Sequence, residues 1–129
     1  MYMIDSDTLI SMGRGNTSLQ EKMNSVGLTE CALSEISLAE LYVGAYKTGN
    51  QKLEPLLEFF EGALKIIPIT QALKTFAKLR VQLESTGARL ETMDLFIAAT
   101  ALEGGHTLVS HNKRHYSRIP GLNMEDWLE

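Results

Sequence analysis

The chain has 129 residues, of which 44% are hydrophobic, and its formal net charge is −4 at pH 7. This length allows one sizeable hydrophobic core but not two ordinary domains, so we expect a single domain over residues 1–129. The acidic balance argues against indiscriminate nucleic-acid binding, which usually depends on a broad positive field. The single cysteine, Cys31, can form no internal disulfide. We expect it to be a small core residue in a reducing compartment.

No segment of the sequence suggests a membrane or an export signal. The longest apolar stretch, LFIAATAL at residues 95–102, is too short to span a bilayer. The first residues lack the basic flank and the cleavage site that are typical of a signal peptide. We therefore expect a cytoplasmic protein with no membrane partner.

Short apolar runs alternate along the chain with apolar residues at helical spacing. The short runs predict buried strands, and the helical spacing predicts amphipathic helices. In chain order the predicted elements are a strand at 2–4, a helix at 16–26, a strand at 31–33, helices at 37–48 and 51–61, a strand at 65–69, a helix at 70–87, an apolar helix that begins near residue 94, and a strand at 106–110. Helices that follow strands in this way predict an α/β fold, with a parallel sheet covered on both faces.

Polar residues at helix starts have a structural explanation that stays open beside a functional one. Asp7 is a possible N-cap of a short helix, TLISM. Ser37 and Glu40 have the spacing of a capping box, in which Glu40 bonds the N-cap amide. Asp94 suits a helix start because the helix macrodipole favours negative charge there.

Four polar residues that are distant in sequence flank the carboxyl ends of predicted strands. They are Asp5, which ends the first strand, Glu40 in the helix after the second strand, Asp94 in the helix before the last strand, and Asn112 just after that strand. Ligands of open α/β sheets bind beyond these strand ends, so we expect the four residues at one edge of the sheet. Two carboxylates about 5 Å apart repel by about 3 kcal/mol at an effective dielectric of 20, so the cluster needs a cation. Oxygen ligands favour Mg²⁺ or Mn²⁺.

Four segments spread over the whole chain carry a family resemblance. They are MYMIDSDTLI, SEISLAELYVGA, ETMDLFIAATAL and TLVSHNKRHYSRIPGLNMEDW. In this order and spacing they resemble the Asp-Thr-Asn strand end, the Ser-x-Ile-Thr-x-x-Glu-Leu-x-x-Gly segment, the Asp-x-x-Ile-Ala-Ala helix and the closing strand, basic loop and tail of PIN-domain ribonucleases. Specifically, they resemble the VapC-type toxins of type II toxin–antitoxin systems. The resemblance implies a three-layer α/β/α PIN-like fold with a central parallel sheet of four to five strands.

The resemblance also implies an activity and partners. The activity is that of a toxin, a Mg²⁺- or Mn²⁺-dependent endoribonuclease that hydrolyses phosphodiester bonds in structured RNA such as transfer RNA. The family's acidic positions transfer onto Asp5, Glu40 and Asp94, with Asn112 as the fourth catalytic residue. Asp5 and Asp94 would hold the ion, and Glu40 would bind it through a water or act as general base. The implied partners are the RNA substrate, a cognate antitoxin whose tail covers the acidic edge, and a second copy of the chain in a homodimer.

Other residues near this edge are predicted to bind the substrate. Ser6 or Thr8 could donate a hydrogen bond to a phosphate, and Asp7 or Asn112 could position a second metal or the scissile phosphate. Tyr116 could stack on an unpaired base. The candidates for contacts with the RNA backbone are Lys113, Arg114 and Arg118. A solvated loop is an equally open interpretation of this basic run.

Two positions depart from the family pattern and leave an alternative function open. Asp7 stands where the family usually has Asn, and Asn112 stands where many members have Asp and others Asn. Asn112 is neutral, so it would bind a second metal weakly, although its carbonyl oxygen can still orient a water. The alternative is a catalytically weakened PIN-like module that binds RNA or a protein without cleaving it.

Two other interpretations of these residues lie outside the family. His111 and His115 are four residues apart, the spacing of two zinc ligands on one helical face, but no third ligand has suitable spacing. A phosphorylation-driven receiver-like module needs an aspartate at the end of its third strand, where KIIPIT ends in Thr70. Both are weaker than the ribonuclease interpretation.

Overall fold

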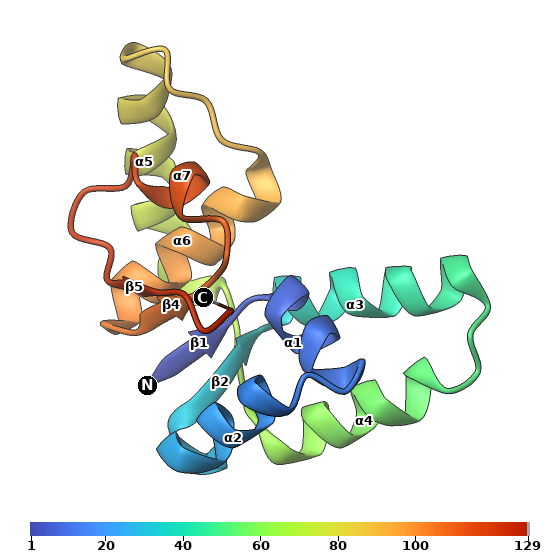
Figure 1. The fold of residues 1–129 in the computed structure, drawn as a ribbon. Coiled ribbons are helices and arrows are strands. Elements are labelled where there is room, and N and C mark those ends of the chain that lie inside the picture. The colour runs from blue at the N-terminus through green and yellow to red at the C-terminus, as the bar shows by residue number, and fades with distance from the viewer. Residues whose placement is uncertain (129) are drawn as a thin grey trace.

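The computed structural model describes residues 1–128. Its strands are β1 (Tyr2–Ile4), β2 (Cys31–Ser34), β3 (Lys65–Ile67), β4 (Thr107–Val109) and β5 (Met124–Glu125). They form one five-stranded sheet in the order β3-β2-β1-β4-β5, and every neighbouring pair runs parallel. β1 therefore lies at the centre of the sheet, with β2 and β4 beside it (Figure 1).

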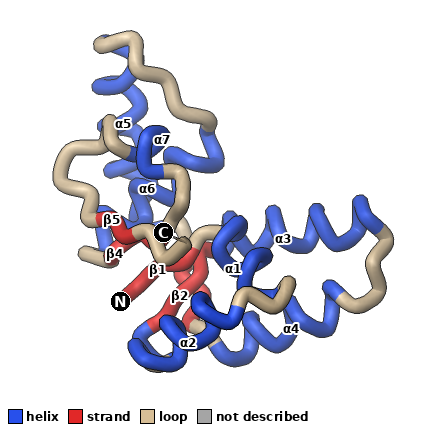
Figure 2. The backbone as a smooth tube through the Cα atoms, in the orientation of Figure 1, coloured by secondary structure: helices blue, strands red, loops and turns tan. Residues whose placement is uncertain are grey.

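Helices cover both faces of this sheet. They are α1 (Ser6–Gly13), α2 (Thr17–Val26), α3 (Glu35–Thr48), α4 (Leu53–Ala63), α5 (Leu73–Ser85), α6 (Thr92–Gly104) and α7 (Lys113–Tyr116), with short 3₁₀ turns η1 (Leu28–Glu30) and η2 (Thr70–Ala72). α1 to α4 lie on one side of the strands, and α5 to α7 lie on the other (Figure 2). The predicted three-layer α/β/α fold is confirmed. None of the helices in residues 1–128 has the length and apolar character needed to cross a bilayer.

Side chains along the central strands alternate between two hydrophobic cores. In β1, Met3 packs in the core of α5 and α6, and Ile4 packs in the core of α1 to α4. In β4, Leu108 packs in the core of α5 and α6, and Val109 packs in the core of α1 to α4. All four side chains are 0% exposed. Successive strand residues point to opposite faces, so a sheet that is covered on both sides requires these continuous apolar runs.

The predicted strands are confirmed with small changes of bounds, and Cys31 is buried in the core as expected. The sequence pattern does not predict β5, because its two residues are too few to show an alternation. β5 pairs with β4 through Leu108 and Met124 and extends the sheet at its edge. Just after β5, Trp127 is buried and its ring lies 5.5 Å from that of Tyr2.

The start of α3 differs from the predicted one, and the capping box of Ser37 and Glu40 is wrong. Ser34, the last residue of β2, is the N-cap, and its Oγ accepts a hydrogen bond from the Ile36 amide at 3.1 Å. The chain passes from β2 into α3 without a loop, so the cap lies at the end of the strand. Ser37 is thus inside the helix and buried, and its hydroxyl has no hydrogen-bond partner in the described part of the chain. Glu40 therefore has no capping role.

Replacing the cap tests this assignment. Ser34→Ala is expected to lower the free energy of unfolding by about 1 kcal/mol, because the Ile36 amide loses its acceptor. Ser37→Ala is the matched control in the same helix. It is expected to change stability by less than about 0.5 kcal/mol, since the Ser37 hydroxyl makes no hydrogen bond within residues 1–128. Urea denaturation measures both values. A larger loss for Ser37→Ala than for Ser34→Ala contradicts the assignment.

Candidate active site

Asp5 lies at the carboxyl end of β1 and begins α1. Its side chain is the N-cap of that helix, and Oδ1 accepts a hydrogen bond from the Thr8 amide at 3.0 Å. The Asp5 amide donates to the Val109 carbonyl at 3.0 Å, which joins this position to β4. The interpretation of Asp7 as the cap is wrong, because α1 begins at Ser6, directly after the strand. Asp7 is exposed in the first turn.

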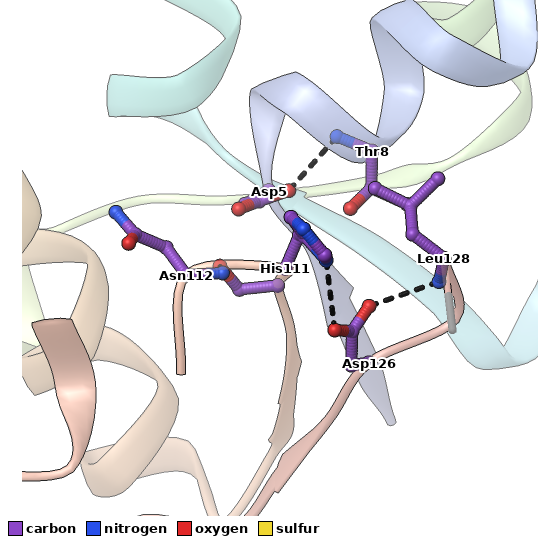
Figure 3. Close-up of polar contacts among 7 residues, drawn as sticks. Asp5, Thr8, His111, Asn112, Asp126 and Leu128 are labelled. Atoms are coloured by element: carbon purple, nitrogen blue, oxygen red, sulfur yellow. Dashed lines mark hydrogen bonds and ion pairs between the residues drawn. The ribbon is translucent and has the colours of Figure 1, made fainter. Parts of the chain in front are cut away.

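The Asp5 carboxylate is buried, with 8% of the residue exposed. This burial raises the pKa of Asp5 above its ordinary value. Hydrogen bonding with the buried Ser110 side chain and with Thr8 acts in the opposite direction and stabilises the ionised form. Figure 3 shows Asp5 between the start of α1 and Asn112.

Glu40 lies on α3 and is half-buried. Burial raises the pKa of Glu40, and the negative charges of Asp94, Asp7 and Asp5 raise it further. These acids come from α6, α1 and the end of β1, so the fold brings them within electrostatic reach of one another. The edge of the sheet where they meet is the one at which the sequence predicted a cluster.

Asp94 lies in the first turn of α6, and α7 supplies a partner to each of its oxygens. His115 Nε2 is 2.9 Å from Oδ2, and the Tyr116 hydroxyl donates to Oδ1 at 3.3 Å. Tyr116 is only 4% exposed. The prediction that Tyr116 stacks on an RNA base is therefore wrong, because the ring is enclosed in the core of α5 and α6.

Asn112 follows β4 and is exposed beside Asp5 (Figure 3). The backbone amide of Asn112 donates a hydrogen bond to Ser110 Oγ at 3.0 Å, and this bond fixes the turn that leads into α7. His111 Nδ1 lies 2.8 Å from Oδ2 of Asp126, whose side chain is 2% exposed. Asp126 Oδ1 also accepts a hydrogen bond from the backbone amide of Leu128.

The zinc interpretation of the two histidines is wrong. His111 precedes α7 and His115 lies within it, so the two do not share a helical face. They engage different carboxylates, those of Asp126 and Asp94.

A divalent cation fits the chemistry of the acidic cluster. Asp5, Glu40 and Asp94 offer carboxylate oxygens whose mutual repulsion a cation relieves. In residues 1–128, no three Asp, Glu, His or Cys side chains gather closely enough to form a complete ligand group. Mg²⁺ usually keeps several waters and binds through one or two carboxylates, so it does not require such a group.

An open cleft of about 530 Å³ adjoins the cluster. It is lined by Arg80, Arg89, Leu90, Glu91, Thr92, Met93 and His115. His115 joins the cleft to the acidic cluster through its contact with Asp94. Arg118 Nη1 donates to the Arg89 carbonyl at 2.6 Å, which places this predicted RNA contact beside the cleft. Nothing in the sequence marks Arg80 or Arg89 as a site residue. Only the fold brings α5, which carries Arg80, and the loop before α6, which carries Arg89, to the same cleft.

The other predicted substrate-binding residues divide by exposure. Lys113 and Arg114 are exposed on α7, and Ser6 is half-buried at the start of α1. Thr8 is 1% exposed, and its hydroxyl is buried. The structure therefore gives no support to Thr8 as a phosphate ligand.

Comparison with known proteins places the chain in a family. The model of the PIN domain family matches residues 2–122. Ribonuclease VapC2 of Rickettsia felis is 33% identical over 136 residues, with 98% of each chain covered. The tRNA(fMet)-specific endonuclease VapC of Salmonella typhimurium is 30% identical over 129 residues, with 98% of this chain and 97% of the relative covered.

Solved structures show the same likeness. DNA-bound VapBC from Salmonella typhimurium has a TM-score of 0.89 at 30% identity, with 98% of this chain and 97% of that chain covered. VapBC2 from Rickettsia felis, bound to a promoter DNA fragment, has a TM-score of 0.88 at 29% identity, with 98% of each chain covered. The chain therefore belongs to the PIN-domain family and, within it, to the VapC-type toxins.

Proposed function

We propose that this protein is a metal-dependent endoribonuclease that hydrolyses RNA phosphodiester bonds as the toxin of a toxin–antitoxin pair. The observation that carries the proposal is the convergence of Asp5, Glu40 and Asp94, whose charges are close enough to raise the pKa of Glu40. The ribonuclease and endonuclease names of relatives that match nearly the whole chain support the reaction class.

The side chains have separate roles in this reaction. Asp5, fixed as the cap of α1, and Asp94, fixed by α7, would hold the divalent ion. When bound, Mg²⁺ or Mn²⁺ would supply positive charge that stabilises the developing negative charge of the reaction and would make water a better nucleophile. Glu40 would accept a proton from the attacking water or bind the ion through a water, and its raised pKa suits a general base. Asn112 orients the water or the scissile phosphate through its side-chain amide.

The proposed substrate is structured RNA, such as transfer RNA. By name, the Salmonella typhimurium relative acts on tRNA(fMet). Ser6 and Asp7 lie at the acidic edge, where the scissile phosphate would sit. The cations that would contact the RNA backbone are Lys113, Arg114 and Arg118, together with Arg80 and Arg89 of the cleft.

The proposed protein partner is a cognate antitoxin whose tail covers the acidic edge. Solved structures similar to this chain are of VapBC, and one is of VapBC-1 from nontypeable Haemophilus influenzae, with a TM-score of 0.85. We also expect a homodimer, as the family resemblance implies.

Cleavage of total RNA tests the proposed activity. The purified protein is expected to cut RNA with Mg²⁺ and not with EDTA. Asp94→Asn is expected to abolish this cleavage, and Glu40→Gln to slow it by about 10² to 10⁴-fold, as for loss of a general base. Glu103→Gln is the matched control, because Glu103 lies exposed at the other end of α6. Binding of RNA by wild type without any metal-dependent cleavage would favour the weakened binding module.

The chemistry of the product ends tests which group attacks the phosphate. Because water is the proposed nucleophile, the fragments are expected to carry 5′-phosphate and 3′-hydroxyl ends. Mass spectrometry of the fragments distinguishes these ends. A 2′,3′-cyclic phosphate would show attack by the ribose hydroxyl and refute the water mechanism.

Charge repulsion in the cluster predicts an effect on stability without metal. At a pH above the folded-state pKa of Glu40, its carboxylate is ionised, and burial and the neighbouring acids disfavour this charge. The free energy of unfolding is therefore lower at such a pH. Glu40→Gln is therefore expected to be more stable than wild type at pH 7 in EDTA. The difference should shrink as the pH falls through and below the ordinary value of 4.5, because Glu40 becomes protonated in both states there. Denaturation at the two pH values measures it, and a variant that is less stable at pH 7 would contradict the repulsion.

A further inference from the structure

We infer that Tyr116 is a positioning residue for the metal site, and that its hydroxyl fixes the Asp94 carboxylate in the orientation that receives the divalent ion. The inference rests on the metal-dependent function proposed above. It assigns a role to a buried side chain that cannot itself contact RNA.

The geometry holds the Asp94 carboxylate at both oxygens. The Tyr116 hydroxyl is 3.3 Å from Oδ1, and His115 Nε2 is 2.9 Å from Oδ2. An ionised carboxylate only accepts hydrogen bonds, so both α7 side chains must donate to it. Each oxygen has more than one lone pair, and Oδ1 therefore keeps the capacity to bind an ion while Tyr116 donates to it.

The two donors differ in their surroundings. The His115 side chain is 33% exposed and lines the open cleft. Tyr116 is buried, and its hydroxyl lies near enough to Asp94, Asp5 and Glu40 for all three charges to add to the effect of burial in raising its pKa.

A phenol suits this position because it is a donor without charge. A phenol is un-ionised at neutral pH, and the Tyr116 hydroxyl presents its proton to Oδ1 of Asp94. A lysine or arginine at the same place would neutralise the cluster and compete with the divalent cation. Tyr116 orients Asp94 and leaves the negative charge of the cluster available.

The core fixes the position of the hydroxyl. The Tyr116 ring belongs to the same hydrophobic cluster as Leu95, Leu108 and Ile119. Leu95 directly follows Asp94 on α6, so the ring and the carboxylate are held by one packed unit. Tyr116→Phe keeps this packing and removes only the hydroxyl.

Titration calorimetry with Mn²⁺ tests the inference on the full chain. Tyr116→Phe is expected to bind Mn²⁺ about tenfold more weakly than wild type, the lower end of what loss of a ligand's supporting hydrogen bond usually costs. Tyr42→Phe is the matched control, since the Tyr42 hydroxyl bonds Glu61 between α3 and α4, at 3.1 Å. It is expected to bind Mn²⁺ as wild type does.

Kinetics separate positioning from a purely structural role. At saturating Mn²⁺, Tyr116→Phe is expected to recover wild-type kcat, with the KM for RNA unchanged, because the hydroxyl acts on the metal site alone. Equal Mn²⁺ affinity of wild type and Tyr116→Phe overturns this inference and leaves the proposed function standing. A lower Tm that persists at saturating Mn²⁺, with unchanged Mn²⁺ affinity, also overturns it. No Mn²⁺ uptake by wild type overturns the proposed function and the inference together.

Discussion

The hydrogen bond from the Thr8 amide to Asp5 is the contact on which the site depends. Asp5 directly follows β1 and is the N-cap of α1, so this bond holds its carboxylate at the centre of the sheet. Because β1 lies between β2 and β4, the residues that follow those two strands flank Asp5. Glu40 comes after β2 and Asn112 after β4. The strand order therefore gathers the polar side chains, and no long loop is needed to bring them together.

The same arrangement works against the stability of the fold. A buried N-cap carboxylate loses hydration, and Ser110 and Thr8 compensate only in part, since the pKa of Asp5 stays raised. Glu40 adds a second disfavoured charge. Sites that bind cations commonly hold such repulsion in the empty state, because the ion relieves it on binding. The electrostatic cost at this edge is offset by the two apolar cores on the faces of the sheet.

The layers of the fold and the convergence of the acids were open to prediction from the sequence. Both follow from periodicity and from the rule that parallel strands end at one edge. The helix starts were harder to predict. Ser34 and Ser37 are equally good N-caps by residue type, and Ser34 takes this role because the chain passes from β2 into α3 without a loop. The contacts of His115 and Tyr116 with Asp94 depend on a helix of four residues, too short to leave a periodic pattern. Sequence spacing suggested zinc for His115, and the neighbouring basic residues suggested base stacking for Tyr116.

α7 has two faces with different chemistry on a single helical turn. Lys113 and Arg114 are exposed on it, while Tyr116 is enclosed and meets Asp94. The exposed cationic surface and the support of the Asp94 carboxylate are thus supplied by the same four residues, so a sequence change in this turn affects both at once.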